Sequence, residues 1–166
     1  MIYRYIVERK LRHAFEALNR GDHGTVLAAF SPDAEHVFYG QHALAGARHD
    51  MKTIVPWYAR LKTVLPDLRF EIDSVLVRGM PWNTVALVTW RDSFSLRDGS
   101  LGANQGAHVL RLKWGKVTSL RIHCDTQVLA DVLRRQSDLG VAEAALPPID
   151  DSSAAYQPAG VALAFS

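Results

Sequence analysis

The chain has 166 residues, of which 48% are hydrophobic and 22% charged, a composition typical of one globular domain with its own core. The formal net charge is only +2 and the Lys and Arg residues are scattered, which argues against nucleic acid as a partner. A single cysteine, Cys124, excludes an intrachain disulfide. No apolar run approaches the roughly 20 residues that cross a bilayer, so we expect no membrane association, no export and a cytoplasmic location.

The N-terminal part of the chain predicts two helices and then a strand. Apolar residues recur at helical spacing over residues 3–19, and Gly21 can end that helix. Asp22 can cap a second, short helix that Pro32 terminates. The residues that follow, 35–39, favour a strand.

A third helix can begin at Asp50 or Thr53, with Pro56 tolerated in its first turn, and Pro66 ends it. Beyond it the hydrophobic pattern has the period of strands, and the short links between the runs suit antiparallel neighbours. The runs cover residues 70–78, 84–96, 107–114 and 117–125.

A last helix is expected over residues 126–139, closing at Gly140. Helices first and a meander of strands afterwards argue for an α+β fold. Residues 147–166 are rich in Ala, Ser, Asp and Pro and show no clear period. We therefore expect one domain over residues 1–146 and a tail that is loose or docked on a partner subunit.

Several short segments together resemble the ketosteroid-isomerase-like and SnoaL-like polyketide-cyclase group of the nuclear transport factor 2-like superfamily. Their order and spacing match that group over roughly residues 3–139. The resemblance implies a cone-shaped, curved antiparallel sheet packed against N-terminal helices, with an additional C-terminal helix, a deep apolar pocket and a homodimer. The matching segments are residues 17–22, 30–34, 40–46, 65–67 and 114–117.

Transfer of the steroid-isomerase mechanism fails residue by residue. That mechanism needs a Tyr on the first helix, an Asp base near the end of the first strand and a protonated Asp on a later strand. Here the Tyr position is Ala14, the position of the Asp base falls at or beside Phe38, and the position of the protonated Asp falls near His108. The mechanism is therefore absent as written.

In SnoaL-like cyclases a carboxylate at the end of the last strand acts as acid and base, with polar partners on the strand before it. The resemblance assigns these positions to Asp125 and His108. Because strand residues two apart share a face, His123 would project with Asp125. Asp125 also precedes a helical pattern, so it is equally an N-cap candidate. The sequence therefore leaves two roles for Asp125, a helix cap and a proton donor.

Asp92 is the second carboxylate of interest. It alternates with Ala86, Val88, Trp90 and Phe94, which would place it on an apolar strand face. A buried carboxyl group has a raised pKa and suits general acid–base work, or it can orient a histidine. If the alternation slips at a bulge, Asp92 instead faces water.

The pocket wall is expected to contain aromatic and polar residues that bind the substrate. Each has a plainer reading as a core residue or as a hydrogen-bonded wall. Spacing typical of metal ligands is missing, so no metal is expected. The predicted substrate-binding residues are His36, Phe38, Trp57, Trp90 and Asn104.

Two functions follow as hypotheses. The first is a cofactor-independent enzyme of the cyclase, isomerase or dehydratase kind, in which Asp125, assisted by His123, His108 or Asp92, moves a proton next to a carbonyl while Asn104 steadies the enolate. The second is a non-catalytic protein that binds a small apolar or aromatic metabolite.

Overall fold

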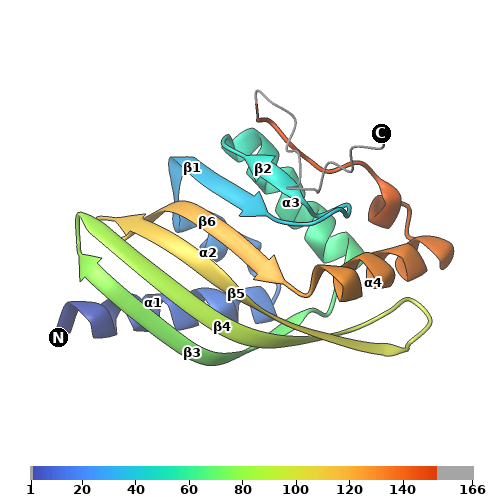
Figure 1. Cartoon of the computed structure of the whole chain (residues 1–166), viewed down its shortest axis with the longest axis horizontal. Helices are drawn as coiled ribbons and strands as arrows, with labels where there is room; N and C mark the ends of the chain where they lie inside the picture. Colours follow the sequence, from blue (N-terminus) through green and yellow to red (C-terminus); the bar gives the residue numbers. More distant parts are fainter. Residues whose placement is uncertain (1, 153–166) are drawn as a thin grey trace, which may run out of the picture.

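The computed structural model describes residues 2–152. Figure 1 shows a long curved sheet with helices on its inner side and at one end. The strand order is β2-β1-β6-β5-β4-β3; β1 and β6 are parallel and every other neighbouring pair is antiparallel. The elements are α1 (Ile2–Asn19), α2 (His23–Ala28), β1 (Phe30–Phe38), β2 (Gly46–Arg48), α3 (Met51–Val64), β3 (Arg69–Met80), β4 (Asn83–Ser95), β5 (Leu101–Lys113), β6 (Lys116–Cys124), α4 (Thr126–Asp138) and the 3₁₀ helix η1 (Ala142–Ala145).

The predicted α+β class, the curved sheet and the additional C-terminal helix are confirmed. Three local expectations were wrong. β1 begins at Phe30, inside the expected second helix, and the short strand β2 was not predicted. Pro56 lies in the second turn of α3, because Asp50 is the N-cap, so it removes one helical hydrogen bond. None of the helices in the part of the chain described here is long and apolar enough to cross a membrane.

The end of α1 is fixed to the sheet by one side chain. The amide of Asn19 donates from Nδ2 to the carbonyl of Phe70 (2.8 Å) and accepts at Oδ1 from the N–H of Phe70 (2.7 Å). This pair satisfies the outer edge of β3 where the strand begins. It holds α1 across the inner face of the sheet, which becomes the core side.

Two glycines on β5 make room for aromatic rings that lie across the inner face. A Cβ atom on Gly102 would come within 2.3 Å of Phe94, and one on Gly106 within 2.8 Å of Trp90 and 2.1 Å of the His123 carbonyl oxygen. Only glycine therefore permits the rings of Phe94 and Trp90 to cover β5. The inner face thus acquires an aromatic wall close to the sheet.

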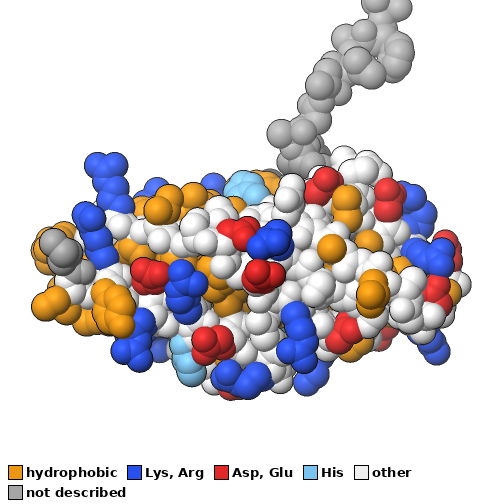
Figure 2. Space-filling model, turned by 90° about the horizontal axis from the view of Figure 1, so that it is seen from below, with side chains coloured by type: hydrophobic (Ala, Val, Ile, Leu, Met, Phe, Trp, Pro, Cys, Tyr) orange, Lys and Arg blue, Asp and Glu red, His pale blue; other side chains and the backbone are white. Residues whose placement is uncertain are grey.

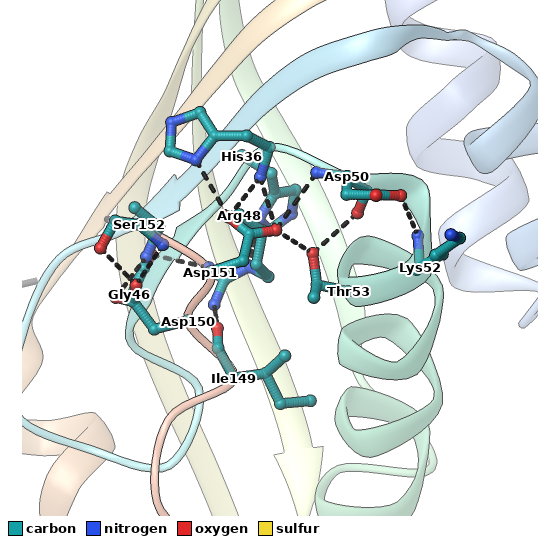
Figure 3. Close-up of polar contacts among 12 residues, drawn as sticks. His36, Gly46, Arg48, Asp50, Lys52, Thr53, Ile149, Asp150, Asp151 and Ser152 are labelled. Atoms are coloured by element: carbon teal, nitrogen blue, oxygen red, sulfur yellow. Dashed lines mark hydrogen bonds and ion pairs between the residues drawn. The ribbon is translucent and has the colours of Figure 1, made fainter. Parts of the chain in front are cut away.

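Residues 149–152, here called the C-terminal strap, pack on β2 and the start of α3 (Figure 3). The guanidinium of Arg48 donates to the carbonyl of Ile149 (2.5 Å), and the Ala47 N–H donates to the Asp150 carboxylate (3.1 Å). Asp151 accepts from the backbone N–H groups of His49 and Asp50. These four residues of the expected tail thus contact β2 and α3 of their own chain, and residues 153–166, the rest of the tail, lie outside the described part of the chain.

Candidate functional site

A small cavity lies between the inner face of the sheet, the end of α1, α3 and the start of α4. Its volume is about 40 Å³, and most of its lining is aliphatic or aromatic. The polar groups in the lining come from Tyr58 on α3, Asp92 on β4, Asn104 and His108 on β5, and Cys124 on β6. The predicted wall residues Phe38, Trp57, Trp90 and Asn104 all line this cavity.

Asp92 stands on the inner face of β4, as the alternation of the strand predicted, and is half-buried against the cavity. Its Oδ1 is buried without a hydrogen-bond partner among the described residues. Burial raises the pKa of this carboxyl group to about 6, against a smaller opposing effect of the Asn104 backbone N–H. Near neutral pH both its protonated and its ionised forms are therefore populated.

His108 is held as a neutral imidazole with its proton on Nε2. The indole of Trp90 donates from Nε1 to His108 Nδ1 at 2.8 Å, so that nitrogen carries no proton. Burial lowers the pKa of His108 to about 3, and the nearby His123 adds to that effect. His108 can consequently donate one hydrogen bond from Nε2 but does not act as a base at neutral pH.

Asp92 and His108 occupy different ends of the cavity wall. In the β4–β5 register Asp92 is opposite Asn104, and His108 lies four residues further along β5. At about 3.4 Å per residue that separation is roughly 13 Å between backbone positions. The two groups cannot act on one carbonyl and its neighbouring carbon together, whereas a longer molecule could contact both.

Asn104 has fewer free groups than the sequence suggested. Its Nδ2 donates to the backbone carbonyl of Asp125 (3.0 Å), and its Oδ1 accepts from the N–H of Gln105 (2.8 Å). The side-chain amide therefore fixes the junction between β6 and α4. Its Nδ2 carries a second hydrogen that the bond to Asp125 does not use, so its role in steadying an enolate stays a prediction.

Asp125 is the N-cap of α4. Its Oδ1 accepts from the backbone N–H groups of Gln127 (3.1 Å) and Val128 (3.2 Å), and its side chain is not part of the cavity lining. His123 is exposed and stacks on Tyr39, with ring centroids 4.7 Å apart. The expectation that this pair would meet His108 in one cavity is wrong, because β6 turns Ile122 and Cys124 inward instead.

His36 lies behind the cavity wall and not in it. Its ring contacts Trp57 at a centroid distance of 4.4 Å, and its Nδ1 accepts from Arg48 Nε at 3.2 Å (Figure 3). Burial, and then the positive charge of Arg48, lower the pKa of His36 well below its usual value. His36 therefore supports Trp57, whose own Nε1 donates to the Leu44 carbonyl at 2.8 Å.

Sequence reasoning missed two polar residues of the cavity. Cys124 lies on the face of β6 opposite His123, and that face is the inner one; burial raises the pKa of its thiol to about 12. Tyr58 lies on α3 and lines the cavity, and burial raises the pKa of its phenol as well. The alternation of β6 contained the first signal, since Cys124 shares parity with Leu120 and Ile122.

The arrangement supplies one carboxyl group with a raised pKa in apolar surroundings and one neutral hydrogen-bond donor at a distance. Within residues 2–152 no three His, Cys, Asp or Glu side chains gather closely enough to hold a metal ion.

Residues 11–120 match the SnoaL-like domain family, and since they make up more than half of the chain, the protein belongs to this family. No curated protein matches the chain. The fold, with its helices on the inner side of a six-stranded sheet, is the one that this family shares with nuclear transport factor 2-like proteins.

Several solved structures share the fold at low identity. A nuclear transport factor 2-like protein of unknown function from Burkholderia pseudomallei K96243 is 23% identical, with a TM-score of 0.64 over 76% of this chain and 95% of that one. TerC, co-crystallised with polyporic acid, is 21% identical, with a TM-score of 0.59 over 76% and 96%. A candidate SnoaL-like polyketide cyclase from Jannaschia sp. CCS1 is 15% identical, with a TM-score of 0.59 over 76% and 90%.

Proposed function

We propose that this protein is a cofactor-independent proton-transfer enzyme that acts on an apolar or aromatic carbonyl compound, with Asp92 as its acid and base. The observation that carries the proposal is the Asp92 carboxyl group, which lines an apolar cavity and has a pKa raised to about 6, and whose Oδ1 has no hydrogen-bond partner within residues 2–152. A group with a pKa near the working pH both accepts and returns a proton efficiently. Isomerisation and ring closure of the cyclase type need that exchange and no further reagent.

In this proposal the ionised Asp92 removes a proton from the carbon next to the carbonyl and returns it at a second position. His108 is neutral and donates a hydrogen bond from Nε2–H to a polar group of the substrate. Because it lies about four residues from Asp92 along the sheet, this polar group is not the carbonyl beside the reacting carbon. The aromatic wall of Phe38, Trp57 and Trp90 excludes water and holds the planar part of the substrate. Asp125 keeps its structural role at the start of α4.

The size of the cavity limits what can bind without rearrangement. Its volume of about 40 Å³ is far below the roughly 300–1,000 Å³ of typical ligand pockets. A substrate must therefore move side chains of the wall or place only its reacting end there. TerC, which shares the fold, was crystallised with polyporic acid, and this supports an aromatic ligand for the present chain.

Hydrogen–deuterium exchange next to a carbonyl tests the proposal without knowledge of the natural substrate. Apolar ketones such as 2-tetralone are incubated with the protein in D₂O and followed by NMR. We expect exchange above the buffer rate and a loss of about 100-fold or more in Asp92→Asn. The matched control is Asp125→Asn, which retains a good N-cap and should leave the exchange rate unchanged.

Unchanged exchange in Asp92→Asn would contradict the proposal. The second candidate, a non-catalytic binding protein, is favoured by the capping role of Asp125, which takes that carboxylate out of the cavity lining. It predicts that aromatic ligands bind to the wild-type protein while no ketone in a broad panel exchanges faster than in buffer.

A further inference from the structure

A second, larger hollow lies between α1, α2 and the inner face of β5 and β6. Its volume is about 620 Å³, within the range of small-molecule sites. Its walls are apolar and come mainly from Leu11, Phe15, Val26, Leu110 and Leu120. We call it the α1 groove. None of the predicted substrate-binding residues lies in it.

The rim of the α1 groove is cationic. Arg9, Lys10 and Lys116 line it, His13 stands beside them, and none of the lining residues in the described part of the chain is acidic. Lys116 is held in place by a hydrogen bond from Nζ to the carbonyl of Ala28 (2.6 Å). A chain with a formal net charge of only +2 has thus placed three positive charges around one apolar hollow.

The turn between β5 and β6 completes the rim. Gly115 has φ +79°, and Lys10 Nζ lies 3.2 Å from the position that a Cβ atom on this glycine would take, so glycine permits Lys10 to approach the turn. Trp114 precedes it with φ +50°, a left-handed conformation that is strained for a bulky residue, and 73% of its surface is exposed. The fold therefore holds an indole at the mouth of the groove, beside the two lysines.

Apolar surface continues around this mouth. Figure 2 shows hydrophobic side chains gathered at the end of the molecule where α1 begins, with Lys and Arg side chains next to them. At its inner end the groove reaches Leu18, Tyr58 and His108, which also line the small cavity. These shared residues form the wall between the two spaces.

We propose that the α1 groove binds a small amphiphilic anion, an apolar chain or ring system with one terminal carboxylate, with the apolar part between α1 and the sheet and the carboxylate between Lys10 and Lys116. Apolar walls bind the body, and a rim with positive charges and no negative ones selects for the anionic end. The inference goes beyond the proposed proton transfer, because it depends on no titration of Asp92.

Titration calorimetry with decanoate and 1-decanol tests the proposal, because the two probes share their apolar chain and differ in charge. We expect the wild-type protein to bind decanoate more tightly than 1-decanol. The double variant Lys10→Gln/Lys116→Gln should weaken decanoate about tenfold and 1-decanol less than twofold. The control Lys52→Gln/Lys62→Gln removes two lysines outside the groove and should change neither affinity.

A steric variant locates the site. Ala14 lines the groove, so Ala14→Phe places a ring between α1 and the sheet and should weaken binding of both probes strongly. Equal affinity for decanoate and 1-decanol, no binding of either, or unchanged decanoate binding in the Lys10/Lys116 or Ala14 variants would overturn the proposal. Asp92→Asn should leave the decanoate affinity unchanged. The decanoate measurements therefore test the groove, and the exchange measurements test proton transfer, independently of each other.

Discussion

The carboxyl group of Asp92 has an energetic cost for the fold. Its pKa is about 6 in the folded chain against 3.8 for the unperturbed group, because burial disfavours the charged form. Between these two values the folded state binds more protons than the unfolded state. The free energy of unfolding therefore falls as the pH rises from about 4 to 6, and above 6 the loss is complete.

Asp92→Asn should remove this cost, since the amide has nearly the same shape and never ionises. We expect the variant to be more stable than wild type by on the order of 2 kcal/mol at pH 8 and equally stable near pH 4. Urea unfolding at both pH values measures the difference. If the gap between the two proteins is the same at both pH values, the Asp92 carboxyl group titrates normally in the folded chain.

At the scale of elements, the C-terminal strap couples the end of the chain to β2 and α3. The Asp151 carboxylate accepts from the backbone N–H groups of His49 (2.8 Å) and Asp50 (3.2 Å) and from the hydroxyl of Thr53. It therefore satisfies donors just before α3, while Asp50 caps the helix itself by accepting from the Lys52 N–H at 2.8 Å. Two carboxylates near one helix start are favourable for its dipole.

Asp151→Ala should lower the free energy of unfolding by about 1–2 kcal/mol near neutral pH, because three donors lose their acceptor. Burial raises the pKa of Asp151, but hydrogen bonds from Thr53 and His49 outweigh it and lower the pKa overall. The stabilisation is thus present above the unfolded pKa of about 3.9 and is lost as the pH falls through the lower folded value.

Thermal unfolding between pH 3 and pH 7 checks this expectation, with Asp138→Ala as control, since Asp138 is exposed at the end of α4. The difference between wild type and Asp151→Ala should shrink toward the acidic end. A pH-independent difference, or an equal effect in the control, would show that the Asp151 carboxylate does not hold the strap.

At the scale of the whole molecule, the outer face of the sheet presents apolar side chains. Leu76 on β3 pairs with Leu87 on β4, and Val85 lies opposite Arg78 on the same face. Leu76 is 62% exposed. We propose that the homodimer implied by the family resemblance forms through this face.

Leu76→Glu should convert a wild-type dimer into a monomer, because it places a charge beside the apolar side chain of Leu87 on this face. Sedimentation or light scattering measures the mass in solution. Val55→Glu is the control, as it changes another exposed apolar residue, on α3. A monomeric wild-type protein, or a dimer that survives Leu76→Glu, would contradict the proposed interface.

The sequence predicted the fold well because helix spacing, caps and strand alternation are local signals. Asp22 and Asp50 cap the helices that they were expected to cap, and β4 alternates without a slip through Asp92. The site was harder to predict. Whether His123 or Cys124 faces inward depends on which side of β6 meets α1 and α3, and a single strand cannot reveal that.

The strap and the α1 groove could not be predicted from the sequence, for a related reason. Arg48 meets Ile149 across 101 positions of the chain, and no periodic pattern links them. The groove combines lysines of α1 and of the β5–β6 turn, whose proximity depends on how α1 crosses the sheet. Contacts of this kind follow from tertiary packing and leave no trace in local spacing.

The chain's single thiol is a chemical probe for the opening of the interior. Cys124 lines the small cavity, and its pKa of about 12 leaves almost no reactive thiolate at neutral pH while the fold is closed. We expect alkylation of this half-buried thiol to become faster when the cavity wall opens, so that its rate reports the opening. A molecule that occupies the cavity would slow the alkylation of Cys124. A time course followed by mass spectrometry can therefore screen for ligands before any turnover is known.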